Sequence, residues 1–186
     1  MTLTLVTGGV RSGKSRYAEA LLRTAPVVRY VAPLVDAGDD PEWVRRVQAH
    51  RLRRPAGWVT VEGPDVAAAV RRAAEPVVVD CLGTWVTALV DRAQAWADPA
   101  AAESVVDAEV TALLRACTGI PHDVVMVTNE VGWGVVPEYP SGRLFRDLLG
   151  SVNARVSAAA DRVVLVVAGR ALELGPAPTV PGEDPA

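Results

Sequence analysis

Residues 3 to 16, LTLVTGGVRSGKSR, constrain the fold of this chain more than any other stretch. They contain the phosphate-loop pattern GxxxxGK[ST], formed by Gly8, Gly9, Val10, Arg11, Ser12, Gly13, Lys14 and Ser15. An apolar run precedes the pattern and a helical sequence follows it, which is the strand–loop–helix context that the motif requires. The alternative is a glycine-rich turn without a ligand, but this context favours a nucleotide site.

The residue types in this loop suit phosphate chemistry. Gly8 and Gly13 let the backbone curl so that its N–H groups point at phosphate oxygens. Lys14 can reach the β- and γ-phosphates, and the Ser15 hydroxyl can bind Mg²⁺. Lys14 is also the only lysine among 19 basic residues, so the chain keeps lysine's compact charge only at this position.

Composition narrows the class of protein. The chain has 186 residues, 50% of them hydrophobic, with a net charge of −3, which argues against a nucleic-acid surface. Two cysteines fit a reducing compartment, and we see neither a leader sequence nor an apolar run long enough to span a bilayer. We therefore expect a cytoplasmic protein with one catalytic domain over residues 1–174 and a disordered Pro/Gly-rich tail over residues 175–186.

Strand and helix patterns alternate along the chain, and the central strands are continuous apolar runs. This predicts an α/β fold of the P-loop NTPase (RecA-like) type, with a mainly parallel sheet flanked by helices on both faces. Strands are expected over residues 3–6, 27–32, 58–62, 76–80, 123–128 and 162–168. Helices are expected over residues 14–24, 41–53, 65–74, 83–95, 99–117 and 141–160.

Asp80 ends the apolar run Val77-Val78-Val79, where a parallel strand delivers its last residue to the ligand-binding edge. An acid there can hold Mg²⁺ opposite Ser15. The alternative role, which could coexist with the first, is the N-cap of the following helix. Residues 80–83 also spell DxxG, but the chain has no NKxD sequence for guanine, so a switch GTPase is not expected.

Two further segments attract attention. Residues 45–55 place His50 among arginines, which is either a solvated basic helix face or a phosphate-binding segment whose imidazole attacks phosphorus. Asn129 and Glu130 follow another buried strand on a glycine-flanked loop, which suits substrate binding. The alternative for that loop is an ordinary turn.

Together these segments resemble the bifunctional adenosylcobinamide kinase/adenosylcobinamide-phosphate guanylyltransferases of cobalamin biosynthesis. The resemblance covers nearly the whole chain apart from the tail. The most specific segments are HRLRRPAGWVTVE at 50–62 and VTNEVGWGVVPEYPSGRLFRDLLGSVN at 127–153. TGGVRSGKSRYAE at 7–19, YVAP at 30–33, VVVDCLGTWVTALV at 77–90 and ADRVVLVVAG at 160–169 complete it.

The resemblance implies two reactions that use ATP or GTP with Mg²⁺. The chain would phosphorylate adenosylcobinamide, then transfer GMP from GTP through a guanylylated histidine to adenosylcobinamide phosphate, giving adenosylcobinamide-GDP. His50 and Lys14 would be catalytic, and Ser15 and Asp80 would bind the metal. Besides the phosphate loop, the nucleotide-binding positions would be Ala32, Pro33, Leu34, Arg51, Leu52, Arg53, Arg54, Glu62 and Thr84. Relatives form homotrimers, so a homo-oligomer is expected.

Two rival interpretations stay open from sequence. One is a plain P-loop small-molecule kinase in which His50 is merely structural, and it predicts no covalent nucleotide. The other is a nucleotide-gated regulatory protein that binds partners through its arginine helix, and it predicts slow turnover without dependence on cobinamide.

Overall fold

The computed structural model describes residues 1–33, 45, 48 and 54–175. Its strands are β1 (Leu3–Thr7), β2 (Arg29–Ala32), β3 (Val59–Glu62), β4 (Val77–Asp80), β5 (Val124–Val127), β6 (Arg162–Val167) and β7 (Arg170–Glu173). Its helices are α1 (Lys14–Leu21), α3 (Val66–Arg71), α4 (Leu82–Ala93), α5 (Pro99–Cys117) and α6 (Pro140–Ala159). None of the helices in this part of the chain combines the length and the apolar character needed to cross a membrane.

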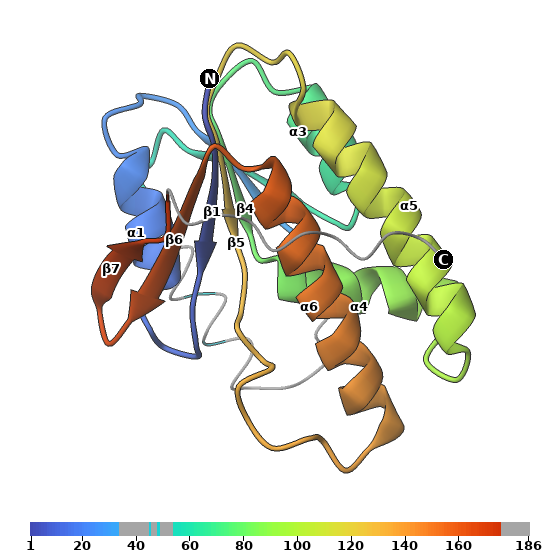
Figure 1. Cartoon of the computed structure of the whole chain (residues 1–186). Coiled ribbons are helices and arrows are strands. Elements are labelled where there is room, and N and C mark those ends of the chain that lie inside the picture. The colour runs from blue at the N-terminus through green and yellow to red at the C-terminus, as the bar shows by residue number, and fades with distance from the viewer. Residues whose placement is uncertain (34–44, 46–47, 49–53, 176–186) are drawn as a thin grey trace.

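The strands form one seven-stranded sheet in the order β3-β2-β4-β5-β1-β6-β7 (Figure 1). Every neighbouring pair is parallel except β6 and β7, which are antiparallel. β1 therefore lies inside the sheet, between β5 and β6, and its carboxyl end opens into the phosphate loop. The α/β fold with a mainly parallel sheet is confirmed.

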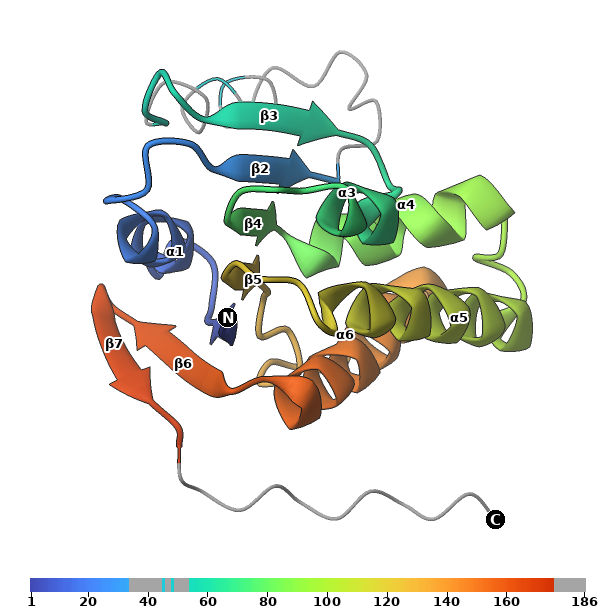
Figure 2. The same ribbon diagram turned by 90° about the horizontal axis from the view of Figure 1, so that it is seen from above.

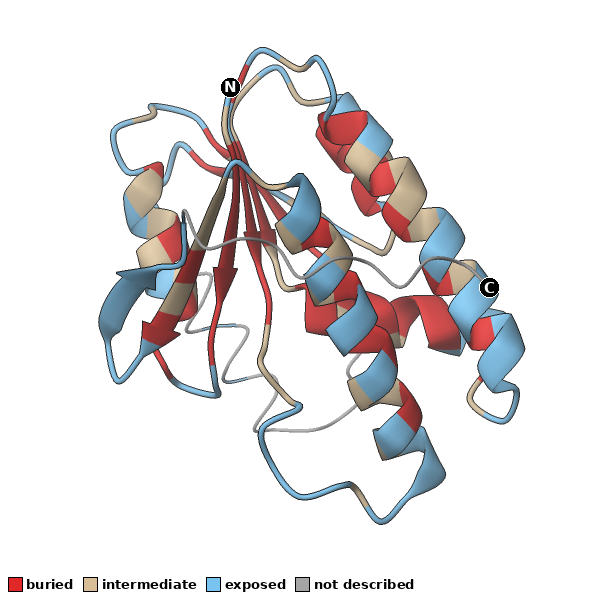
Figure 3. Cartoon of the chain, viewed as in Figure 1, coloured by how far each residue is buried: buried red, intermediate tan, exposed pale blue. Residues whose placement is uncertain are grey.

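The described helices are divided unequally between the two faces of the sheet (Figure 2). Helices α3, α4, α5 and α6 pack on one face, and α1 lies on the other. Successive residues of a central strand point to opposite faces, so Val77 and Val79 join the apolar cluster under the four helices while Val78 joins the cluster under α1. Because both faces are covered, β1 and β5 are buried along their whole length (Figure 3). This explains the unbroken apolar sequence of β5, whereas β1 includes the buried polar residues Thr4 and Thr7.

The expected elements are present with small shifts in their ends. The second strand begins at Arg29 rather than at residue 27, and the helix expected over residues 65–74 spans Val66–Arg71. α5 begins after Asp98, whose carboxylate accepts a hydrogen bond from the Ala101 N–H at 3.1 Å. Most of the expected 41–53 helix and the tail after Gly175 lie outside the described residues.

Strand β7 was not predicted from the sequence. It follows β6 through the two-residue turn Ala168-Gly169, with φ angles of 49° and 77°, and it pairs Val167 with Arg170. Two consecutive positive φ angles are the geometry of a tight hairpin turn. All four residues of β7 are exposed, so no apolar run marked them as a strand.

Candidate nucleotide site

The phosphate loop has a tightly constrained backbone. Gly13 has a φ of 100° and stands at the start of α1, a conformation that favours glycine. Gly8 is constrained by space, because a Cβ there would lie 2.3 Å from the Val166 carbonyl oxygen and 2.8 Å from Ser12 Oγ. The β6–β7 turn also supports the loop, since the Gly169 N–H donates to the Ser12 carbonyl at 2.9 Å.

Two polar side chains of the loop are buried. Lys14 is 8% exposed, and its ammonium Nζ donates to the Gly9 carbonyl at 3.2 Å, which folds the side chain back over the loop. Ser12 is equally buried, and its hydroxyl oxygen has no hydrogen-bond partner among the described residues. A buried hydroxyl without a partner costs free energy, and a phosphate oxygen bound in the loop would supply one.

Asp80 stands at the carboxyl end of β4, level with the end of β1. Both Asp80 and Val6 are in register with Val127 of β5, the strand that separates them. The backbone at Asp80 is therefore two strand spacings, or roughly 10 Å, from the β1 backbone. The N-cap position of α4 belongs to Cys81, so the N-cap role considered for Asp80 is wrong.

The Asp80 carboxylate accepts a hydrogen bond from the hydroxyl of Tyr30 in β2 at 2.5 Å. Burial, together with the negative charge of Asp80, raises the pKa of Tyr30 well above its usual range. The tyrosine therefore remains the proton donor in this pair. Sequence reasoning missed Tyr30, which looks like an ordinary apolar strand residue.

The residues proposed as Mg²⁺ ligands fit that ion in kind. The Ser15 hydroxyl and the Asp80 carboxylate are oxygen donors, which Mg²⁺ prefers, and both residues are half-buried. Among the described residues, no cluster of three or more histidine, cysteine or acidic side chains could hold a metal alone. A site built from one or two protein ligands and substrate phosphates is the usual arrangement for Mg²⁺.

Glu130 lies directly against the phosphate loop. Its carboxylate accepts a hydrogen bond from the Thr7 hydroxyl at 2.6 Å, and its N–H donates to the Gly8 carbonyl at 3.2 Å. The two residues share a hollow of about 200 Å³ between β1, β6 and α6 with Asn153. Asn153 donates to the Asn129 carbonyl at 3.1 Å, while the buried side-chain oxygen of Asn129 has no partner in the part of the chain that the structure describes.

The remaining described candidates lie farther along the same edge. Ala32 ends β2, Pro33 follows it, and Glu62 ends β3 in register with Ala32. β3 is four strand spacings from β1, so Glu62 lies roughly 19 Å from the β1 backbone. Thr84, in the first turn of α4, contacts the Cys81 sulfur at 3.3 Å.

Arg54 packs on the Tyr30 ring, with its guanidinium carbon 3.5 Å from the ring centroid. The structure thus brings Lys14, Asp80 and Glu130 to the carboxyl ends of β1, β4 and β5. Ala32 on β2 lies one strand beyond Asp80, and Glu62 on β3 lies two strands beyond it. Leu34, His50, Arg51, Leu52 and Arg53 lie outside the described residues.

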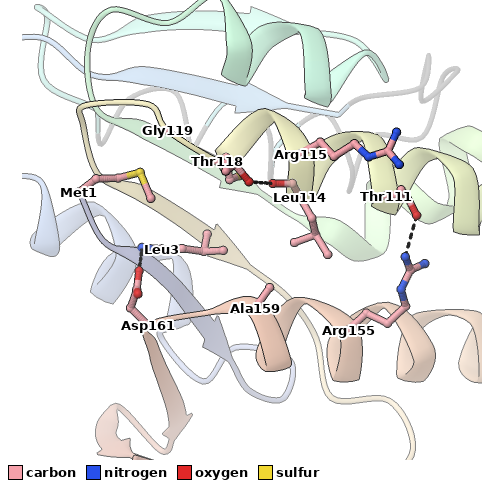
Figure 4. Close-up of a pocket in the computed structure, with 11 residues that line it drawn as sticks. Met1, Leu3, Thr111, Leu114, Arg115, Thr118, Gly119, Arg155, Ala159 and Asp161 are labelled. Atoms are coloured by element: carbon pink, nitrogen blue, oxygen red, sulfur yellow. Dashed lines mark hydrogen bonds between the residues drawn. The ribbon is translucent and has the colours of Figure 1, made fainter. Parts of the chain in front are cut away.

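A second hollow, of about 430 Å³, lies at the opposite edge of the sheet, where β1 begins (Figure 4). Its polar side chains bond to their neighbours: Asp161 accepts from the Leu3 N–H at 2.7 Å, and Arg155 donates to the Thr111 hydroxyl at 2.8 Å. Burial raises the pKa of its Cys117 thiol to about 11, so little reactive thiolate exists at neutral pH.

Comparison with known proteins identifies the family. The family model described as "Cobinamide kinase / cobinamide phosphate guanyltransferase" matches residues 4–174. The chain belongs to this family. Its members include the bifunctional adenosylcobalamin biosynthesis protein CobU of Salmonella typhimurium, which is 44% identical over 174 residues, spanning 89% of this chain and 95% of that protein.

Two further relatives have similar coverage. CobU of Escherichia coli is 42% identical over 89% of this chain and 95% of that protein. The bifunctional protein CobP of Pseudomonas aeruginosa is 39% identical over 91% of this chain and 95% of that protein. The resemblance recognised from the sequence motifs is therefore confirmed.

Among solved structures, an ATPase from a bacterial type III secretion system matches with a TM-score of 0.54 and 14% identity. The match covers 88% of this chain and half of the ATPase chain. At this identity the likeness concerns the fold alone, and it agrees with a P-loop arrangement.

Proposed function

We propose that this member of the CobU family catalyses both reactions for which the family is named. It would phosphorylate adenosylcobinamide with ATP or GTP, and then transfer GMP from GTP to adenosylcobinamide phosphate, giving adenosylcobinamide-GDP. The observation that carries the proposal is the phosphate loop, whose buried Lys14 and unpartnered Ser12 hydroxyl are arranged to receive an anion. The family match over residues 4–174 supplies the chemical class.

In the kinase reaction, the loop N–H groups and Lys14 hold the β- and γ-phosphates of the donor. Ser15 and Asp80 would hold Mg²⁺, which would neutralise charge on the transferring phosphoryl group. The substrate hydroxyl oxygen bonds to the γ-phosphorus as the bond to the β-phosphate oxygen breaks. Asn129 and Glu130 face the substrate, a role supported by the contact of Glu130 with Thr7 and by the unpartnered oxygen of Asn129.

In the guanylyl transfer, a ring nitrogen of His50 attacks the α-phosphorus of GTP and pyrophosphate leaves. A phosphate oxygen of adenosylcobinamide phosphate then attacks the same phosphorus and releases the histidine. The arginines at 51, 53 and 54 stabilise the phosphate charge. Leu52, Thr84 and residues 32–34 line the nucleotide, and the Glu62 carboxylate accepts from guanine N1–H and N2–H₂.

The placement of Glu62 supports different nucleotide positions in the two reactions. Glu62 lies roughly 19 Å along the edge from β1, which carries the phosphate loop. A GTP held through its base by Glu62 would therefore extend over β2 and β4, rather than place its guanine next to the loop.

We also propose that the protein is a homo-oligomer, with three copies as implied by the family resemblance. We further propose that it works in the cytoplasm and binds no nucleic acid. Two observations support the last two of these assignments. Cys81 and Cys117 are both free thiols, as expected in a reducing compartment, and the net charge is −3. Sedimentation of the purified protein would test the oligomer.

The decisive experiment is covalent labelling. The protein is incubated with Mg²⁺ and GTP that is radiolabelled at the α-phosphate, and is then followed by denaturing gel and intact mass. Acid-labile, alkali-stable label is expected on the native chain and is expected to be absent from His50→Asn. Because the chain has only one other histidine, His122→Asn is the matched control and should still be labelled.

Absence of label from a folded native protein that binds GTP would contradict the histidine mechanism. It would favour the rival P-loop kinase, in which His50 is structural. A protein that neither becomes labelled nor phosphorylates cobinamide would contradict both reactions and favour the regulatory alternative.

A further inference from the structure

Tyr30 links two parts of the proposed site that are far apart in the sequence. It lies in the interior of the sheet on β2, only 1% exposed, yet its hydroxyl bonds to the carboxylate of Asp80, fifty residues away. A buried tyrosine hydroxyl needs a hydrogen-bond partner, and a backbone carbonyl is the commonest choice. Here the partner is the acid proposed to bind Mg²⁺.

The ring of Tyr30 also contacts Arg54, which follows the part of the arginine-rich stretch over residues 45–55 that lies outside the described ranges. The Arg54 guanidinium stacks over its ring at 3.5 Å, a cation–π distance, and donates to the Thr60 hydroxyl at 2.8 Å. Trp58 packs beside the same ring, with centroids 6.3 Å apart and planes inclined at 34°. The ring is therefore held on β2 by its neighbours, and its hydroxyl direction is fixed.

We propose that Tyr30 is a positioning residue that orients the metal-binding carboxylate of Asp80, and that its ring docks Arg54 at the same edge. The inference rests on the proposed role of Asp80 and deepens it. A carboxylate at the end of a strand can rotate about two side-chain bonds. The hydrogen bond fixes one carboxylate oxygen, and so sets the direction in which the other faces.

Partners that orient a metal ligand are typically worth 10- to 100-fold in metal affinity when they are removed. Tyr30→Phe removes the hydroxyl and keeps the ring, so the stacking with Arg54 and Trp58 should persist. The variant should therefore lose Mg²⁺-dependent affinity, while its Mg²⁺-free nucleotide affinity and its melting temperature stay close to native values.

The test is an equilibrium titration of the whole protein with a fluorescent GTP analogue, with and without Mg²⁺. The quantity compared is the ratio of the two dissociation constants, which reports the gain in affinity that Mg²⁺ supplies. In Tyr30→Phe this gain should fall roughly tenfold or disappear. The matched control is Tyr17→Phe, because Tyr17 packs on the same apolar cluster but its hydroxyl accepts from Arg162, at 3.3 Å.

Asp80→Asn, alone and combined with Tyr30→Phe, separates this inference from the proposed function. If Tyr30 acts through Asp80, adding Tyr30→Phe to Asp80→Asn should change the Mg²⁺ gain little. A native gain in Tyr30→Phe, beside a lost gain in Asp80→Asn, would overturn the role of Tyr30 and leave the metal assignment standing. A native gain in Asp80→Asn would overturn both.

Discussion

The hollow at the amino edge of the sheet and the phosphate-loop region at the carboxyl edge differ in whether their buried polar atoms have hydrogen-bond partners. The amino edge holds the hollow of about 430 Å³, but none of the residues that line it, all described, has a buried side-chain nitrogen or oxygen without a partner. At the carboxyl edge, Ser12 of the phosphate loop and Asn129 after β5 each leave a buried oxygen without a hydrogen bond from any described residue. His122 Nδ1 and Trp58 Nε1, next to the amino ends of β5 and β3, also have no partner among the described residues, but neither residue lines the amino-edge hollow. The hollow of about 430 Å³ and the unpartnered oxygens of Ser12 and Asn129 therefore lie at opposite edges of the sheet.

This difference supports the proposed phosphate site at the carboxyl edge. Burying an unpartnered hydroxyl or amide oxygen costs free energy, and a fold tolerates the cost where a ligand will supply the partner. The amino-edge hollow carries no such cost, so filling or altering it should leave catalysis intact. The following predictions test that contrast.

The largest effect is expected from Lys14→Ala. In other enzymes, removing a hydrogen-bond donor that stabilises charge in the transition state lowers turnover roughly 10²–10³-fold. The chain has no second lysine to replace this one. Steady-state phosphorylation of cobinamide would measure the effect. Arg23→Ala removes an exposed cation just after α1 and should retain the native rate. A native rate in Lys14→Ala would contradict the assignment of the nucleotide site to the carboxyl edge.

Ser12→Ala should separate binding from stability. A hydrogen bond to a charged group contributes about 1.5–3 kcal/mol, so nucleotide affinity should fall roughly 10- to 100-fold. The free protein should be as stable as the native chain or slightly more stable, because the alanine buries no unpartnered hydroxyl. Calorimetric titration and thermal melting would measure the two quantities, with the exposed Ser151→Ala as control. A lower melting temperature in Ser12→Ala would contradict the conclusion that the Ser12 hydroxyl has no hydrogen-bond partner in the free protein.

Gly8→Ala should destabilise the fold, because its Cβ would lie 2.3 Å from the Val166 carbonyl oxygen. Overpacking of this kind costs about 1–3 kcal/mol, and each kcal/mol lowers the melting temperature by about 2–4 °C in a chain of this size. The neighbouring Gly9→Ala is the matched control, because its Cβ would meet no atom within 4 Å. Equal melting temperatures for the two variants would contradict the close approach of β6 to the loop.

The smallest effect is expected from Arg155→Ala at the amino edge. Arg155 is paired with Asp107, but both side chains are partly exposed, so the loss of stability should be about 1 kcal/mol or less. Both transfer rates should stay native. A large fall in either rate would show that the amino-edge hollow contributes to function, and would remove the contrast between the edges.

The sequence predicted those features whose cause is local. The positions of the phosphate loop and of Asp80 follow from the apolar runs directly before them in the chain. Both could therefore be expected at strand ends. The Tyr30–Asp80 contact depends on how β2 and β4 align, and no pattern within either strand encodes it. Likewise β7 exists because the Ala168-Gly169 turn folds four exposed residues back onto β6.

Because β7 runs antiparallel to β6, it brings the last described residues back to the amino edge of the sheet. β1 starts at the amino edge, and Leu174 reaches the same edge, where its N–H donates to the Val163 carbonyl at 2.9 Å. Met1 and Gly175 therefore both lie away from the phosphate loop. A tether joined to the molecule at either position would hold it on a solid support with the nucleotide entrance facing the solution, so the immobilised protein should bind GTP as readily as the free one.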